Sequence, residues 1–211
     1  MKNNWLSVLI ILFTLMFACP VESQNWEFVK EKDGIKIYSR QETGKKTKIF
    51  KGVTEIKELA ETVFTVLEDI NHTEWWDENI SQIKVLQYEK NKINQYYLVY
   101  NMPWPFKDRD LTVDVTSTIN MTTGEFKLVG VPSKSIFTKS KDLIRIKDYH
   151  QVWTVKPEKN YSHVELEFYI DPDENLPNWL LNMTMIDSPI NTIKSLKKFI
   201  EKKKSMNTNQ L

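Results

Sequence analysis

The residues with acid–base or nucleophilic side chains are scattered along this chain and form no recognisable catalytic motif. The three histidines, His72, His150 and His163, lack the short spacing with which neighbouring histidines share a metal ion. There are only five glycines, and none belongs to a phosphate-binding loop or a Gly-x-Ser-x-Gly nucleophile turn. The sequence therefore predicts no catalytic residues, no metal ligands and no cofactor.

The chemistry that the sequence does favour is the burial of an apolar surface. Between Val164 and Ile170 the even-numbered residues are apolar, while the odd-numbered ones include Glu165 and Glu167. Residues 111–115 alternate in the same way. This period of two predicts strands with one dry face. Such a face has to be covered by another element of the fold.

The covering element is predicted at the C-terminus. After Pro177, apolar residues recur every three or four positions from Trp179 to Ile200, with lysines between them. This spacing is typical of an amphipathic helix. Pro189 lies inside the helical stretch and lacks a backbone N–H, so we expect a bend or break near residues 185–188.

The remainder of the chain predicts a strand-rich, α+β protein. One further helix is expected over residues 56–67, with Thr54 as its N-cap. The connections between predicted strands are too short for repeated crossover helices, so the sheet is expected to be antiparallel. The predicted strands occupy residues 26–30, 35–38, 49–53, 80–89, 93–101, 111–119, 126–129, 143–147, 151–155 and 163–170.

Residues 1–23 have the pattern of a secretory signal peptide. Lys2 precedes an apolar run from Trp5 to Phe17, which is shorter than the ~20 residues of a membrane-spanning helix. Cleavage after Ser23 is expected to release an exported, periplasmic or extracellular protein that begins at Gln24. Two alternatives stay open, which are a membrane anchor formed by the same run and lipid attachment at Cys19.

We expect one domain over residues 24–204, followed by a disordered tail at residues 205–211. Loss of residues 1–23 removes Cys19, the only cysteine, so packing alone has to stabilise the domain. The formal net charge is +1 at pH 7, which gives no long-range field to attract nucleic acid. We therefore expect no nucleic-acid partner, and we expect a monomer.

Several short motifs follow one another from Trp26 to Ile200. They are Trp76-Asp77-Glu78-Asn79-Ile80, Ile83-Lys84-Val85-Leu86-Gln87, the stretch 103–110 with Arg109-Asp110, Leu143-Ile144-Arg145, and Ile170-Asp171 with Leu176-Pro177. In order and spacing they resemble the START domain family. The resemblance implies a helix-grip fold, in which a curved antiparallel sheet wraps round a long C-terminal helix and encloses an apolar tunnel. It also implies that a lipid or another apolar small molecule is bound, and in some members transferred, without covalent chemistry.

The resemblance and the alternation together imply a ligand-binding wall of inward-facing side chains. Sterol carriers of this family place an acidic residue and an arginine as a pair inside the tunnel, whereas the matching positions here are Tyr96 and Val115. We therefore expect a drier cavity with one polar contact, from the hydroxyl of Tyr96 or Tyr100. The predicted ligand-binding residues are Tyr96, Leu98, Tyr100, Val113, Val115, Trp153, Leu166, Phe168, Trp179, Met183 and Ile186.

Two other functions stay open beside lipid binding. Polyketide cyclases and aromatases have related helix-grip folds, so Tyr96, His150 or Asp114 is an alternative catalytic group. The other alternative is an interaction module of the cell envelope. For transient membrane contact the candidate is Trp104-Pro105-Phe106, because aromatic residues settle at lipid–water boundaries. Arg109-Asp110 is interpreted as a structural pair that ties a loop to its neighbours.

Overall fold

The computed structural model describes residues 25–89, 93–134, 137, 142–172 and 176–208. The predicted signal peptide at residues 1–23 lies outside these ranges, as do residues 209–211 of the predicted tail. Within the described ranges, no helix is long and apolar enough to cross a bilayer.

Ten strands form one sheet in the order β1-β2-β3-β10-β9-β7-β6-β5-β4, and β8 pairs with β6 outside this path. All the strand pairs along the path are antiparallel, as predicted, and the short pair of β6 with β8 is parallel. The strands are β1 (Glu27–Lys32), β2 (Ile35–Arg40), β3 (Ile49–Ile56), β4 (Ile80–Gln87), β5 (Ile93–Tyr100), β6 (Arg109–Ile119), β7 (Phe126–Pro132), β8 (Ile144–Arg145), β9 (Asp148–Pro157) and β10 (Ser162–Asp171).

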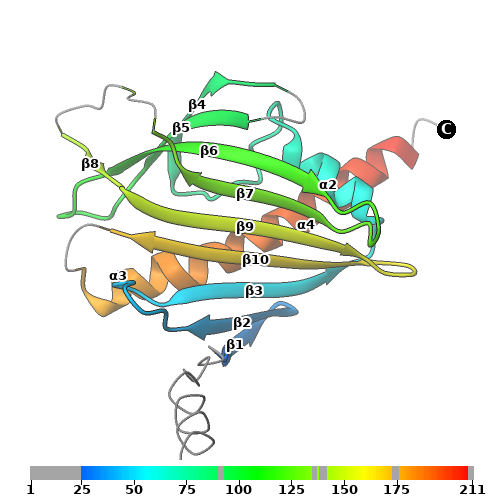
Figure 1. Ribbon diagram of the computed structural model, residues 1–211, viewed down its shortest axis with the longest axis horizontal. Coiled ribbons are helices and arrows are strands. Elements are labelled where there is room, and N and C mark those ends of the chain that lie inside the picture. Colours follow the sequence, from blue (N-terminus) through cyan, green and yellow to red (C-terminus); the bar gives the residue numbers. More distant parts are fainter. Residues whose placement is uncertain (1–24, 90–92, 135–136, 138–141, 173–175, 209–211) are drawn as a thin grey trace, which may run out of the picture.

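The helices lie on one face of this sheet. They are α2 (Ala60–Glu68), α3 (Asn178–Asn182), a π-helical segment (Met183–Asp187) and α4 (Ser188–Thr208). Figure 1 shows α4 running diagonally behind the middle of the sheet, with its C-terminal end beside α2. Residues from α4 and α2, such as Ile193 and Val63, share one buried cluster with Val164 and Leu166 of β10. The predicted α+β helix-grip fold is confirmed.

A glycine allows α4 to approach the sheet closely. Gly52 of β3 lies opposite Ile37 of β2 and Leu166 of β10. A Cβ atom at this position would lie 2.7 Å from the Cδ1 atom of Ile193 in α4, which is closer than two carbon atoms normally pack. The absence of a side chain at Gly52 therefore sets how near the helix lies to this part of the sheet.

The predicted N-cap at Thr54 is wrong. Thr54 lies inside β3, where it pairs with Val164, and its hydroxyl donates a hydrogen bond to the carbonyl of Gly34 (3.0 Å). Helix α2 begins only at Ala60, after Leu59, and has no side-chain cap. The strand continues here because buried and more exposed residues alternate from Gly52 to Ile56 and β10 pairs with β3 as far as Ile56, whereas the pairing with β2 ends at Val53.

The predicted irregularity before Pro189 is confirmed. The chain passes from α3 through the π-helical segment into α4, and the π-helical turn occupies Met183–Asp187. Because Pro189 cannot donate a hydrogen bond to the carbonyl four residues earlier, the backbone there departs from α geometry. At the other end the helix continues to Thr208. Residues 205–208, the first part of the predicted tail, thus extend the helix that precedes them.

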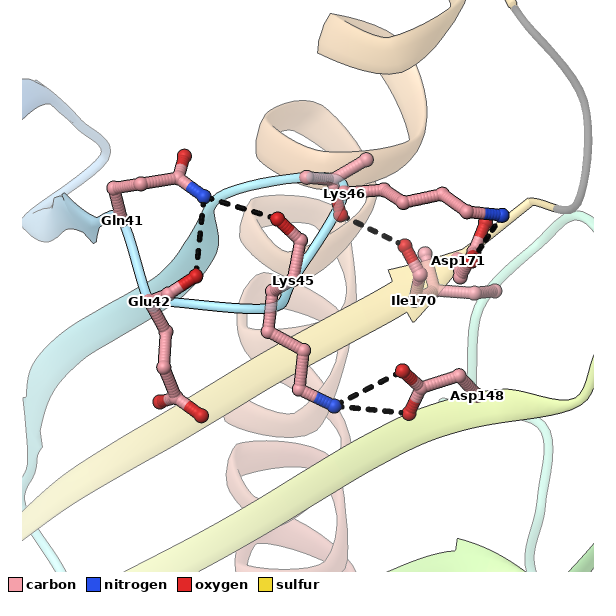
Figure 2. Close-up of polar contacts among 8 residues, drawn as sticks. Gln41, Glu42, Lys45, Lys46, Asp148, Ile170 and Asp171 are labelled. Atoms are coloured by element: carbon pink, nitrogen blue, oxygen red, sulfur yellow. Dashed lines mark hydrogen bonds and ion pairs between the residues drawn. The ribbon is translucent and has the colours of Figure 1, made fainter.

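The loop between β2 and β3 fastens one end of the sheet. Lys45 pairs with both carboxylate oxygens of Asp148 at 3.0 Å, and Lys46 pairs with Asp171 at 2.8 Å. Figure 2 shows the two lysines reaching from this loop to the ends of β9 and β10. This end of the sheet, next to α3 in Figure 1, is thus closed by loops.

The strand predicted at residues 143–147 is shorter in the structure, where β8 comprises only Ile144–Arg145.

Candidate ligand-binding site

The larger of two neighbouring cavities lies between the inner face of the sheet, the segment after α2 and the start of α4. The residues of β5, β6, β9 and β10 that line it alternate along each strand, so one face of the sheet forms the wall. The predicted residues placed around this cavity are Tyr96, Leu98, Tyr100, Val113, Val115, Trp153, Leu166 and Phe168.

The larger cavity is narrow. Its volume is about 90 Å³, counted as the space that the centres of water molecules can occupy. The sheet and helix therefore enclose a real hollow, but a lipid with two long chains enters it only if the walls separate.

A second, smaller cavity adjoins the first on the side of α3. It has a volume of about 50 Å³ by the same measure, and Met183, another predicted wall residue, lines it. Asp77, Tyr100, Phe168 and Ser188 line both cavities. The Ser188 hydroxyl donates a hydrogen bond to the Asp77 carboxylate, so this contact stands at the partition between the two spaces.

Two predicted residues lie at neither cavity. Trp179 is 54% exposed on α3, where its ring meets the ring of Phe106 edge-on with centroids 6.3 Å apart. Ile186 packs against the main core cluster instead. The prediction placed Trp179 and Ile186 on the same apolar stripe as the residues up to Ile200, although a bend or break was expected near residues 185–188. The π-helical turn breaks the helical period, so the apolar stripe of α3 does not continue in phase with that of α4.

The segment between α2 and β4 supplies wall residues that the prediction missed. Trp75 and Trp76 line the larger cavity and meet each other edge-on, with ring centroids 6.2 Å apart. Trp75 also contacts Trp153 at 6.0 Å, and Trp76 contacts Tyr96 at 5.7 Å. The one sequence signal for these wall residues is the adjacent tryptophan pair itself, which lies outside any periodic element. Edge-to-face contacts of this kind fix the orientation of the rings.

Three of the polar groups that line the larger cavity are tyrosine hydroxyls. Among the described residues, the hydroxyls of Tyr96 and Tyr100 have no hydrogen-bond partner, while that of Tyr149 donates to Gln151 at 2.8 Å. Burial raises the pKa of Tyr96 to about 12, with smaller effects from Tyr88 and Glu68. Burial also raises the pKa of Tyr100 and Tyr149. These tyrosines are therefore neutral hydrogen-bond donors at physiological pH.

The alternative catalytic groups are not brought together. Asp114 lies between Val113 and Val115 on β6, and these two valines line the cavity, so the carboxylate points to the opposite face. There it accepts a hydrogen bond from Gln95 at 2.7 Å. His150 likewise lies between two lining residues of β9. Of the three, only Tyr96 reaches the cavity.

Asp110 has a structural role. Its carboxylate is 0% exposed and accepts two hydrogen bonds from Arg145, both 2.8 Å long, and one from Tyr97 at 3.1 Å. The preceding Arg109 is 2% exposed, donates to the carbonyl of Lys107 and lines the smaller cavity. The two-point pairing of Arg145 with Asp110 holds the short strand β8 against β6.

The START domain profile matches residues 16–205 of the chain. The chain belongs to the START domain family. A solved STAR-related lipid transfer protein from Xanthomonas axonopodis is similar to this START domain, with a TM-score of 0.74 and 26% identity over 83% of this chain and 98% of that one.

Curated relatives of this START domain include bacterial and mammalian proteins. An uncharacterised protein of Pseudomonas aeruginosa is 28% identical over 86% of this chain and 89% of its own length. The phosphatidylcholine transfer protein of Mus musculus is 24% identical over 82% of this chain and 83% of its own length. The chain is thus homologous to lipid transfer proteins, in a family whose members are typically non-catalytic.

We expect Arg145→Met to destabilise this START domain strongly. The substitution leaves the buried Asp110 charge without its cation, which costs about 3–5 kcal/mol of unfolding free energy. Urea unfolding followed by circular dichroism measures the loss. The matched control is Lys127→Met, which breaks an exposed pair with Glu125 and is expected to cost less than about 1 kcal/mol. Equal losses in the two variants would contradict the structural role of Asp110.

Proposed function

We propose that this protein binds a lipid or another apolar small molecule between its sheet and α4, without catalysis, and passes it between lipid phases. The observation that carries the proposal is the cavity between sheet and helix, whose walls are mainly aromatic and aliphatic side chains. The names of two relatives, a phosphatidylcholine transfer protein and a STAR-related lipid transfer protein, support the same activity.

Apolar burial supplies the affinity in this proposal. Each methylene group that moves from water into the cavity gains about 0.8 kcal/mol. Some acyl chains are too long for the present cavity. Such a chain enters when α4 separates from the segment that carries Trp75 and Trp76. The Asp77–Ser188 hydrogen bond joins these two parts, next to the π-helical turn. Breaking that contact is therefore part of loading.

Ligand binding in the cavity is tested by a substitution in β6 that places a larger side chain in the cavity. In Val115→Trp the larger side chain occupies the hollow, so we expect the affinity for the neutral dye Nile red to fall by about tenfold or more. Fluorescence titration of the full-length protein measures the affinity. Native mass spectrometry of the unmodified protein is expected to show a retained small molecule.

The matched control is Val131→Trp, in the neighbouring strand β7. Val131 is 40% exposed and lines neither cavity, so the Val131→Trp variant is expected to bind Nile red with the affinity of the parent protein. If Val115→Trp bound the dye as well as the parent protein does, the cavity would not be the binding site.

The proposal includes transient contact with a membrane through an aromatic patch made of Trp104, Phe106 and Trp179. Trp104 is 92% exposed, and Phe106 contacts Trp179 of α3. Met102 from the same loop and Met183 beyond α3 line the smaller cavity. The patch therefore lies beside a route to the ligand space, where Trp side chains suit the lipid–water boundary.

We expect Trp104→Ser to lower binding to neutral phospholipid vesicles by several-fold, because the exposed indole no longer enters the lipid interface. Vesicle sedimentation measures the binding, and the Nile red titration shows whether the cavity is intact. Met121→Ser is the control, since Met121 is 88% exposed at the opposite end of β6. Equal vesicle binding by Trp104→Ser and the parent protein would remove the patch from the proposal.

Export is the remaining part of the proposal. The apolar run at residues 5–17 and the small residue Ser23 support removal of residues 1–23 by a signal peptidase. N-terminal sequencing of protein from the producing cell is expected to begin at Gln24. A chain that keeps Met1, or one cleaved before a lipidated Cys19, would replace this mechanism with one of the two membrane-attached alternatives.

A further inference from the structure

The charged groups that line the larger cavity are all acidic. Glu68 at the end of α2 and Asp77 before β4 both face it, and none of the described residues that line it is a lysine, an arginine or a histidine. The cavity is otherwise apolar or carries neutral donors. A negative potential beside an apolar wall acts more strongly on a charged group that enters than the same charges would in open water.

The negative charge of Glu68 lies at an electrostatically unfavourable position, and no nearby positive charge of the described residues compensates it. It is the last residue of α2, where the helix dipole already presents negative charge, and the last turn of that helix has no basic residue. Among the described residues, the Glu68 carboxylate has no hydrogen bond or ion pair. The nearby Lys203 of α4 pairs with the adjacent Asp69 instead, at 3.3 Å. A cation supplied from elsewhere would relieve this arrangement.

Asp77 is held by neutral donors alone. Its carboxylate accepts hydrogen bonds from the backbone and side-chain amides of Asn79, both 2.9 Å long, and from the Ser188 hydroxyl. No cation of the described residues pairs with it. Its charge acts on the cavity, since it adds to the effect of burial in raising the pKa of Tyr100. The Asp77 carboxylate lies at the partition between the two cavities, where it lines both.

The aromatic side chains between these carboxylates suit the same kind of ligand. Trp75, Trp76 and Tyr96 form a chain of edge-on contacts along the wall. The faces of such rings attract cations. We infer that the larger cavity selects amphiphiles whose head group is positively charged, and disfavours carboxylates with the same chain, through the charges of Glu68 and Asp77. This inference rests on the proposed function.

Among the described residues that line the two cavities, the one cation lies in the smaller cavity. Arg109 lines the smaller cavity and donates a hydrogen bond to the Lys107 carbonyl. It does not line the larger one. A preference for carboxylates would therefore point to Arg109 as the group that binds the head, and would reverse the order of affinities expected here.

The test compares three ligands with one chain length and different head charge. Dodecyltrimethylammonium, dodecanol and dodecanoate are titrated with the full-length protein by calorimetry at neutral pH, below the micelle concentrations of the two ions and the solubility of dodecanol. We expect the cation to bind about tenfold more tightly than the carboxylate, with the alcohol between them. Because the preference is electrostatic, it is expected to shrink as salt is added.

Two variants assign the preference to the two carboxylates. Glu68→Gln is expected to lower the affinity for the cation several-fold relative to dodecanol, and Asp77→Asn to act in the same direction. The matched control is Glu61→Gln, an exposed residue in the first turn of the same helix, which is expected to keep the parent order of affinities. Circular dichroism checks folding, and Glu68→Gln alone decides the question if Asp77→Asn does not fold.

The outcomes separate the two proposals. If neither dodecanol nor Nile red binds the parent protein, the proposed function fails and this inference fails with it. If dodecanol binds and dodecanoate binds as tightly as the cation or more tightly, only the charge selectivity is overturned. A cation preference that survives in folded Glu68→Gln at its full size also overturns the assignment to that carboxylate.

Discussion

The packing of α4 against the inner face of the sheet is the interaction on which the rest of the structure depends. Ile193 and Leu196 of α4 are fully buried in the cluster that includes β10. Gly52 brings the helix close to β3. Toward β5 and β6, the segment with Trp75 and Trp76 lies between helix and sheet, and its rings do not fill the space completely. The ligand cavity is what remains of that gap.

The charges around this core divide into two kinds. Ion pairs at the rim of α4, such as Lys194 with Asp33 and Lys204 with Glu58, are largely exposed and contribute little to holding the helix down. The buried Asp110 carboxylate is different, because removal of its partner leaves a charge out of contact with water. The end of the sheet near β8 is thus fixed firmly, while α4 is held mainly by apolar contacts that ligand entry can exchange for others.

Alternation and helical spacing predicted most of the elements, because each is a local pattern of burial. The prediction failed where a pattern depends on partners distant in sequence. The apolar residues after Thr54 have helical spacing, yet pairing with β10 extends the strand through Ile56. The wall residue Trp76 comes from a segment without periodicity, and Trp179 leaves the predicted wall because a single π-helical turn changes the phase of the helix.

The sequence by itself determined the α+β class, the inward-facing residues of β5, β6, β9 and β10, and the helix that covers them, since a period of two or 3.6 assigns each side chain to a face. Only the tertiary structure decided how much space these faces leave and which charges enter it. Glu68 and Asp77 come from the end of a helix and from a loop, whose directions depend on packing against α4 and the sheet. No local pattern contains that information.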